Sequence, residues 1–209
     1  MTNDEKFHVQ RHAKREVHER NDIERLLDSQ YVAHVGFMDP DTKTPFVIPM
    51  GFARDNNRIL IHGSTGSRIM MSLATGIDIC VSITQLNAIV VARSAFNSSM
   101  NYESVMIFGQ ARVLNDDEKT IALERITEKF IPGMWSYARP LTKKESAATL
   151  IVELSLDKLS AKARTGEPSD DDEDVSLPIW AGLLPVETKL GAPITATNAA
   201  GIDVPSHLL

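Results

Sequence analysis

The chain has 209 residues, of which 43% are apolar, as is ordinary for a globular protein with a buried core. Its 22 basic and 28 acidic residues give a net charge of −6, which argues against a nucleic-acid partner, because nucleic-acid-binding proteins carry basic patches. The single cysteine excludes an intramolecular disulfide, and the charged N-terminus has no apolar segment typical of a secretory signal. We therefore expect a cytoplasmic protein with no membrane partner.

Residues 1–20 are polar and charged, which predicts an N-terminal arm. A short helix should follow, because Asn21 can cap it and Glu24 stands three residues later. Its apolar stripe consists of Ile23, Leu26 and Leu27. We expect one main domain over residues 21–160 and an extended C-terminal tail over residues 161–209.

Within the main domain the hydrophobic period changes from 3.6 to 2, which indicates strands. The predicted strands are 31–38, 45–53, 58–62, 77–85, 87–92, 102–114 and 149–158. Helical spacing predicts one helix over 67–75 and another that starts at Asn115 or Asp116. Hairpins dominate this order, so we expect a mainly β protein, a closed or nearly closed antiparallel barrel with helices at its ends.

Apolar residues lie on both faces of 77–92 and 102–109. This is more apolar strand surface than one barrel interior can bury. The excess predicts burial against a second copy of the chain with two-fold symmetry.

The tail has no regular period, and its acidic run 170–174 is expected to be a solvated linker. An ordered tail is instead indicated by Lys162, Arg164 and Trp180, because two cations and a large aromatic ring suit an anionic, flat cofactor. We therefore expect order at 160–166 and 177–186, contact of the tail with the barrel or the partner subunit, and exposure of the acidic run together with its neighbours.

The stretch "IHGSTGSR", residues 61–68, joins a strand to a helix. The hydroxyls of Ser64, Thr65 and Ser67, the backbone N–H groups of the turn and the Arg68 guanidinium could together hold a phosphate. The alternative is plain helix capping by Ser and Thr. Nearby, Pro49, Met50 and Gly51 lie in a strand expected to pair with 58–62, where an open backbone suits a flat ligand and the alternative is a bulge.

Several ordered blocks carry a family resemblance, among them "HVGF…PFVIPM", "IHGSTGSR", "TQLNAIVVARSAFNSSMNYESVMIFGQARVL", "SAKARTGEPSDDDED" and "PIWAGLLP". With these blocks the chain resembles the flavin-nucleotide-binding branch of the pyridoxamine 5′-phosphate oxidase-like split-barrel family and, more distantly, the nitroimidazole-resistance reductases. The resemblance implies a six-stranded antiparallel split barrel, a homodimer, and FMN bound in two clefts between the subunits.

The resemblance also assigns residues to the cofactor. It assigns the phosphate to Ser64, Thr65, Ser67 and Arg68. It places the isoalloxazine beside Pro49, Met50 and Gly51. A strand from the partner subunit contributes Asn101, Tyr102 and Ser104. The chain departs from the family pattern at Ile69 and Glu103, where a basic residue is common, so Lys162 or Arg164 is expected to complete the compensation of phosphate charge, and Trp180 is expected to dock near the flavin.

The histidines differ in their expected roles. His62, beside the expected flavin, is either a structural histidine or a ligand or proton-transfer group, and it is the candidate catalytic residue. His8 and His12 are spaced for one helix face, but no third ligand is near, so no metal site is predicted. His34 is expected to be a satisfied core residue.

The predicted function is an FMN-dependent oxidoreductase that works as a homodimer on an unknown small-molecule substrate, with NADH or NADPH as the candidate electron donor. The alternatives are a non-catalytic flavin carrier or sensor and a haem-binding split-barrel protein. FAD, a deazaflavin or haem are the corresponding alternative cofactors. Pyridoxamine 5′-phosphate itself is not the expected substrate, because the acidic and then neutral C-terminus does not match the substrate-phosphate cations of those oxidases.

Overall fold

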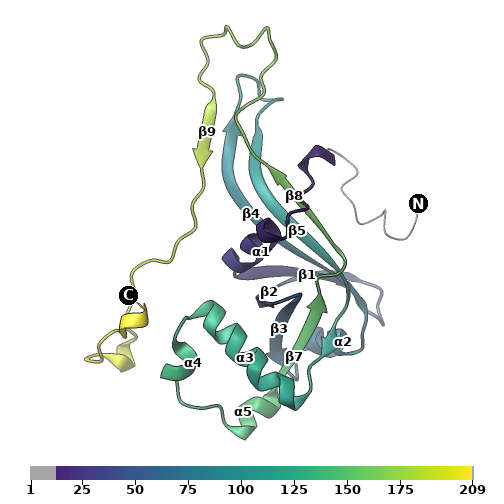
Figure 1. Ribbon diagram of the computed structural model, residues 1–209, viewed down its shortest axis with the longest axis vertical. Coiled ribbons are helices and arrows are strands. Elements are labelled where there is room, and N and C mark those ends of the chain that lie inside the picture. The colour runs from purple at the N-terminus through teal and green to yellow at the C-terminus, as the bar shows by residue number, and fades with distance from the viewer. Residues whose placement is uncertain (1–12, 209) are drawn as a thin grey trace.

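The computed structural model describes residues 13–208, which form one antiparallel sheet with helices around it (Figure 1). Eight strands follow the order β6-β7-β3-β2-β1-β4-β5-β8, and a ninth, β9, pairs with β4. The strands are β1 (Val32–Met38), β2 (Pro45–Asp55), β3 (Arg58–Ser64), β4 (Asp78–Val91), β5 (Ser99–Gln110), β6 (Arg112–Val113), β7 (Thr149–Ser155), β8 (Leu159–Arg164) and β9 (Gly182–Pro185). The mainly β class is confirmed, but the expected count of six strands is wrong, because short strands extend the sheet at β6, β8 and β9.

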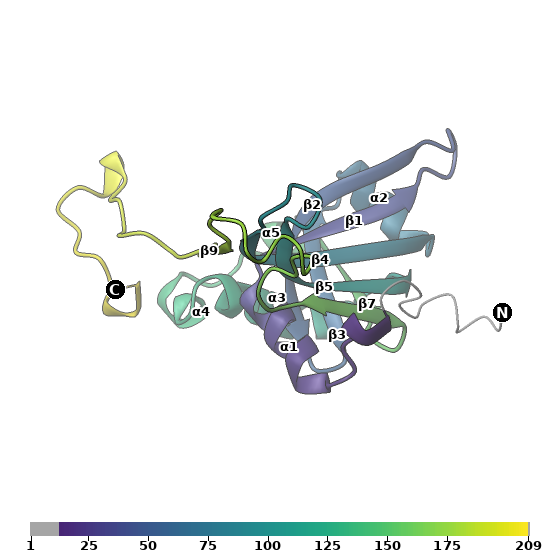
Figure 2. The same cartoon turned by 90° about the horizontal axis from the view of Figure 1, so that it is seen from above.

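The helices lie at the ends and on one face of the curled sheet (Figure 2). The α-helices are α1 (Arg20–Ser29), α2 (Arg68–Ala74), α3 (Asp116–Phe130), α4 (Met134–Tyr137) and α5 (Lys143–Ala148), and short 3-10 turns are η2 (Ala13–Arg15), η3 (Thr197–Ala199) and η4 (Ser206–Leu208). None of the helices within residues 13–208 is both long enough and apolar enough to cross a membrane.

Two apolar clusters organise the domain. The larger one, here the barrel core, fills the inside of the curled sheet with side chains such as Phe52, Ile61 and Val81, each at most 1% exposed. The smaller one lies on the other face of β2, β3 and β7, where α3 packs through Ala122 and Ile126. Alternation along the strands therefore decides which residues face the barrel core and which face α3.

The first helix differs from its prediction at its start. It begins at Arg20, and Glu19 occupies the N-cap position without a side-chain cap bond, so Asn21 lies inside the helix. Arg20 explains the earlier start, because its guanidinium donates to Glu24 Oε1 at 2.6 Å and to Asn57 Oδ1 at 2.8 Å. These bonds tie the first turn to the β2–β3 hairpin.

The predicted strands 77–85 and 87–92 form one long strand, β4. Its ladder with β5 shifts register between Leu86 and Ala88, which leaves Asn87 as the extra residue of a bulge. The bulge exchanges the two faces, so that Ile83 before it and Ala88 after it are both buried. His34 on neighbouring β1 is exposed rather than buried, because Ala33 and Val35 occupy the inward positions.

Beyond the bulge, β4 and β5 leave the barrel as a projecting hairpin, joined by β9 (Figure 1). We call residues 87–101 together with β9 the arm. The arm's loop is held by Asp170, which accepts from Arg93 N at 2.7 Å and from Arg93 Nη1 at 2.6 Å, and the Asp170 side chain is only 5% exposed. The expectation of an exposed acidic run is therefore wrong at Asp170, because its carboxylate is a structural anchor.

The tail contains ordered strands within both segments where order was expected, namely β8 and β9. Strand β8 pairs with β5 and crosses the expected domain boundary at residues 160–161. After β9 the chain runs extended beside the molecule until η4, where His207 lies 5.2 Å from the Tyr137 ring (Figure 1). The extended part leaves Ile194 96% and Leu190 80% exposed.

Candidate functional site

The turn at Ser64–Arg68 connects β3 to α2. Ser64 organises it, because its carbonyl accepts from Ser67 N at 2.9 Å and its hydroxyl accepts from Gly66 N at 3.2 Å. Ser67 stands at the N-cap of α2, yet its side chain makes no cap hydrogen bond. Helix capping therefore does not account for the hydroxyl of Ser67, and the turn has the donor groups that an anion needs.

Arg68 is the exposed cation of this turn. Its Cζ lies 4.8 Å from the centre of the Phe46 ring, an arrangement in which the ring supports the guanidinium from one side. The pKa of Asp39 is lowered, mainly by hydrogen bonds from the Thr42 backbone and hydroxyl and, to a smaller extent, by the charge of Arg68. Arg68 is thus supported by Phe46 of β2, while its exposure leaves it accessible to a ligand.

The strand segment Pro49–Gly51 does not pair with β3 as expected. Its partners are on β1, and the β2–β3 ladder ends at the pair Phe52↔Ile61. Beyond that pair, β3 keeps only its other neighbour, β7, with which it pairs along its whole length, His62 lying opposite Ile151. The sheet therefore splits between Pro45–Gly51 and His62–Ser64, and one edge of β2 is open there.

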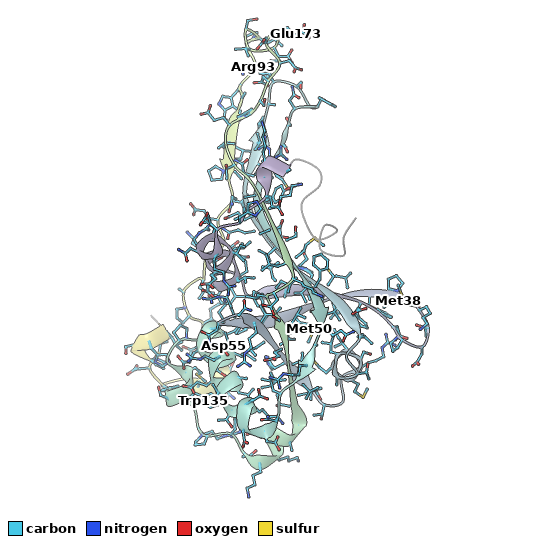
Figure 3. All side chains as sticks on the ribbon, turned by 45° about the vertical axis from the view of Figure 1, so that its right-hand side comes forward. Met38, Met50, Asp55, Arg93, Trp135 and Glu173 are labelled. Carbon is cyan, nitrogen blue, oxygen red and sulfur yellow. The ribbon has the colours of Figure 1, made fainter. Side chains whose placement is uncertain are left out.

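Two glycines at the split permit close packing. A Cβ on Gly63 would lie 2.6 Å from Met70 Cγ, and a Cβ on Gly51 would lie 2.8 Å from Phe130 Cζ. Phe130, at the end of α3, thus covers the backbone that the sequence suggested was open for a flat ligand. Met50 faces the other way and packs against the barrel core (Figure 3).

His62 lies on β3 between the split and the turn. Alternation places His62 and Ser64 on the same sheet face as Leu60, which packs against α3. Partial burial lowers the pKa of His62, so the ring is neutral at pH 7 and one ring nitrogen carries a lone pair. The ring can therefore accept a proton or ligate a metal centre.

The remaining predicted residues form a second group on β5 and β8. Asn101 is buried, accepts from Arg164 Nη1 at 2.5 Å and donates to Gly166 O at 2.9 Å. The ladder places Tyr102 opposite Arg164 and Ser104 opposite Lys162, which pairs the expected cofactor residues of the two strands. Glu103 is held by Arg25 at 2.6 Å, so its charge is compensated within the chain.

Trp180 is separate from both groups. It precedes β9 on the arm, is 63% exposed, and packs its ring against Gly182, where a Cβ would lie 2.8 Å from Trp180 Cζ2. Of the histidines considered for metal binding, His8 and His12 lie outside the described residues. Among residues 13–208, no three His, Cys, Asp or Glu side chains gather where they could hold a metal ion.

The two groups of predicted residues are far apart within one chain. Strands β2, β1 and β4 lie between β3 and β5. At about 4.8 Å per strand, β3 and β5 are about 19 Å apart along the sheet. The Ser64–Arg68 turn and the Asn101–Ser104 segment thus belong to strands that are not neighbours along the sheet.

Sequence reasoning missed a groove of about 830 Å³ beside α3, lined also by α4 and α5. Its aromatic residue, Trp135, is labelled in Figure 3. The signal that could have found its outer wall is the capping-box pattern from Thr142 to Glu145, which marks the start of α5.

Known proteins resemble this chain in sequence and in structure. The family model for pyridoxamine 5′-phosphate oxidase matches residues 19–163. A search of curated proteins returned no match. The structure of the FAD and heme binding protein from Mycobacterium smegmatis is 40% identical, with 92% of this chain and 95% of that chain covered and a TM-score of 0.89. The flavocytochrome Anf3 from Azotobacter vinelandii is 35% identical, with 97% and 94% covered and a TM-score of 0.90.

A more distant solved structure shows the same fold. A Bacteroides thetaiotaomicron protein assigned to 5-nitroimidazole antibiotic resistance is 19% identical, with 71% of this chain and 86% of that chain covered and a TM-score of 0.60. The split-barrel fold expected from the sequence is thus confirmed, with nine strands among the described residues instead of six.

Proposed function

Because this chain belongs to the pyridoxamine 5′-phosphate oxidase family, we propose that it binds a flavin at the Ser64–Arg68 turn and works as a homodimeric oxidoreductase. The observation that carries the proposal is the placement of a neutral histidine, three hydroxyls and an exposed arginine at the point where the sheet splits. When bound, a flavin supplies hydride or electron transfer, and the protein supplies binding and orientation.

The chain's own residues fit this cofactor. Arg68 gives a planar fork for phosphate oxygens, and the Ser64, Thr65 and Ser67 hydroxyls can complete the phosphate contacts. The neutral ring of His62 could hold or release a proton beside the turn. Lys162 and Arg164 can add positive charge from the second group.

Separation of the two groups supports the homodimer. In the proposed homodimer, Asn101, Tyr102 and Ser104 of one subunit would face a flavin held by the Ser64–Arg68 turn of the other, as the family resemblance implies. Apolar side chains left exposed on β4 and β5 provide the contact surface, since Leu86 is 37%, Ile89 40% and Met106 41% exposed. Burial of these side chains in an interface would account for the excess of apolar strand surface in the sequence.

A second candidate function adds haem to the flavin. The relative from Mycobacterium smegmatis is named for FAD and heme, and the one from Azotobacter vinelandii is a flavocytochrome. Both cover nearly the whole chain, which favours FAD over the FMN expected from the sequence and favours electron transfer over a carrier role. His62 is the described histidine at the split, and its neutral ring nitrogen could ligate haem iron.

The test begins with the visible spectrum of the purified protein, in which flavin bands and a Soret band separate the two candidates. Bleaching of the flavin by NADH or NADPH would identify the donor and support an enzyme over a sensor. Arg68→Ala should then weaken flavin binding about 10- to 100-fold, because it removes a charge-assisted contact of about 1.5–3 kcal/mol. Arg125→Ala, which removes an exposed arginine from α3, is the matched control. Unchanged affinity in Arg68→Ala by fluorescence titration would reject the turn as the phosphate site.

A further inference from the structure

The groove beside α3 is apolar along its wall and basic in its charge. Leu123 and Ile131 line it from α3, and Trp135 of α4 adds a large aromatic ring. Of the described residues that line it, the charged ones are Arg139 and Lys143, and both are cations. The groove therefore suits an apolar group that is accompanied by negative charge.

Local hydrogen bonds hold the walls of the groove. The Glu128 carboxylate accepts from two backbone N–H groups around the start of α4, at 2.7 and 2.8 Å. A capping box between Thr142 and Glu145 starts α5, and Glu145 also pairs with Arg139 at 2.5 Å. Lys143 has no ion pair within residues 13–208, so its charge is available to a partner. The groove is thus formed before anything occupies it.

The tip of the arm has the complementary character. Phe96 is 94% exposed, and Asn97 beside it donates to Asp171 at 3.2 Å, which joins the ring and the acidic run into one surface. Residues 93–101 and 167–174 together carry six acidic side chains and one basic one. The tip therefore presents an aromatic ring accompanied by negative charge, which is what the groove suits.

The tip cannot reach the groove of its own subunit. The arm and the helices α3, α4 and α5 lie at opposite ends of the longest axis of the molecule (Figure 1). The end of the tail does not fill the groove either, because His207 contacts Tyr137 and approaches Gly133, neither of which lines it. Within one subunit, the ring at the tip and the groove are both left without a partner.

A two-fold axis perpendicular to the long axis brings these surfaces together. Such an axis exchanges the two ends, so that the arm of each subunit lies beside the helices α3–α5 of the other, and the contact forms twice. Strands β4 and β5 run from the barrel into the arm, and their exposed Leu86 and Ile89 would then lie in the same interface. One symmetry operation thus accounts for the arm, the groove and the exposed apolar strand surface.

We propose that the arm of each subunit inserts Phe96 into the groove beside α3 of a second copy of this chain. Phe96 packs there on Trp135, as aromatic rings commonly pair, and the acidic run 170–174 faces Lys143. This inference rests on the homodimer of the proposed function and names the surfaces that hold it together. It assigns the groove to a protein segment and leaves the flavin site to other residues.

A double-mutant cycle on the full-length protein tests the contact, with the dimer dissociation constant read by analytical ultracentrifugation. Phe96→Ser and Trp135→Leu should each raise this constant about fivefold. The double variant should raise it by less than the product of the two effects, because both changes remove one shared contact. Tyr137→Leu is the matched control, since Tyr137 is an exposed aromatic residue of the same short helix outside the groove, and it should leave the constant unchanged.

A cross-link tests the same contact without removing Trp135. In a Cys80→Ser background, Phe96→Cys combined with Thr127→Cys should form a disulfide-linked dimer on oxidation, because Thr127 lines the groove. Phe96→Cys alone should remain unlinked, and so should Phe96→Cys with Thr42→Cys, which places the second cysteine at an exposed position between β1 and β2.

The outcomes separate this contact from the homodimer itself. A dimer that forms no cross-link between positions 96 and 127, or one whose single-variant effects multiply in full, would overturn the insertion of the arm and leave the homodimer intact. A disulfide formed within one chain would overturn the exchange of arms. A monomeric unaltered protein at micromolar concentration would overturn the homodimer of the proposed function, and the visible spectrum of the same sample would report flavin binding separately.

Discussion

The barrel and the arm are built from the same strands but are stabilised differently. Along β4, Val81 and Ile83 are fully buried in the barrel core, whereas Ile89, beyond the bulge, is 40% exposed. At the tip of the arm Phe96 is 94% exposed. The barrel thus buries the inward face of β4 within one chain, whereas the arm buries Val90 but presents Ile89 and Phe96 outward, where another surface could cover them.

Polar bonds give the arm the order that its packing does not. Arg93 and Asp170 fix the loop at its tip, Asn97 donates to Asp171 at 3.2 Å, and Ser98 donates to Ser94 O at 3.0 Å. Arg93 Nε remains a buried side-chain atom with no partner in the described part of the chain. The arm is therefore an ordered element whose apolar surface and polar groups are incompletely satisfied in one subunit.

The largest expected effect concerns the barrel. Phe52→Ala removes a fully buried ring from the barrel core, and the free energy of unfolding should fall by about 3–5 kcal/mol. Chemical denaturation at constant protein concentration measures the change. A loss below about 1 kcal/mol would mean that the barrel does not depend on its own core and would break the contrast with the arm.

An intermediate effect is expected at the clamp of the arm. Asp170→Asn removes the charged acceptor that binds Arg93, so the tip of the arm should lose local stability. Hydrogen exchange at residues 92–98 and 168–172 measures the loss, with the barrel strands as the internal control. Unchanged protection at the tip would show that the Arg93 contact is not what orders it.

The same clamp predicts a pH dependence. Hydrogen bonds from the Arg93 backbone, followed by its side chain and charge, lower the pKa of Asp170 below its ordinary value of 3.8. A lowered pKa means that the folded clamp favours the carboxylate, so its contribution is complete above the ordinary value and is lost as the pH falls through the lowered one. The protection factors at the tip, which are corrected for the intrinsic pH dependence of amide exchange, should therefore fall in acid, and this fall should be absent in Asp170→Asn.

The smallest effect is expected at Phe96. Phe96→Ser should leave the free energy of unfolding within about 0.5 kcal/mol, because the ring makes little contact in the subunit. If the arm packs on a partner, the same change should raise the dimer dissociation constant about fivefold, as expected for loss of about 1 kcal/mol. Analytical ultracentrifugation reads the dissociation constant. A monomeric unaltered protein, or a variant with an unaltered dimer, would remove the arm from the interface.

Sequence patterns predicted the barrel better than the arm, for a physical reason. Strands such as β1 and β2 carry a period of 2 because one face is buried by the chain itself. At Asn87 a single inserted residue shifts that period, which reads like a turn between two strands rather than a bulge in one. In β8 the inward position is the small Ala161, whose hydrophobic signal is weak.

The candidate site was predictable in its local part and not in its distant contacts. Residues 61–68 carry their chemistry in one short segment, so Ser64, Thr65, Ser67 and Arg68 could be chosen from sequence. Phe130 covers Gly51 from far along the chain, and no local pattern shows such a contact. The groove beside α3 likewise arises from the packing of α3 with α4 and α5, which are only four and six residues long.

The open edge of β2 has a consequence for solubility. Unpaired strand edges are templates on which other chains can add strands and aggregate. Proline is found at sheet edges where its nitrogen faces away from the existing ladder, and β2 carries Pro45 and Pro49 along the segment that pairs only with β1. This edge therefore presents carbonyl acceptors with few N–H donors, which discourages strand addition even when no ligand covers the edge.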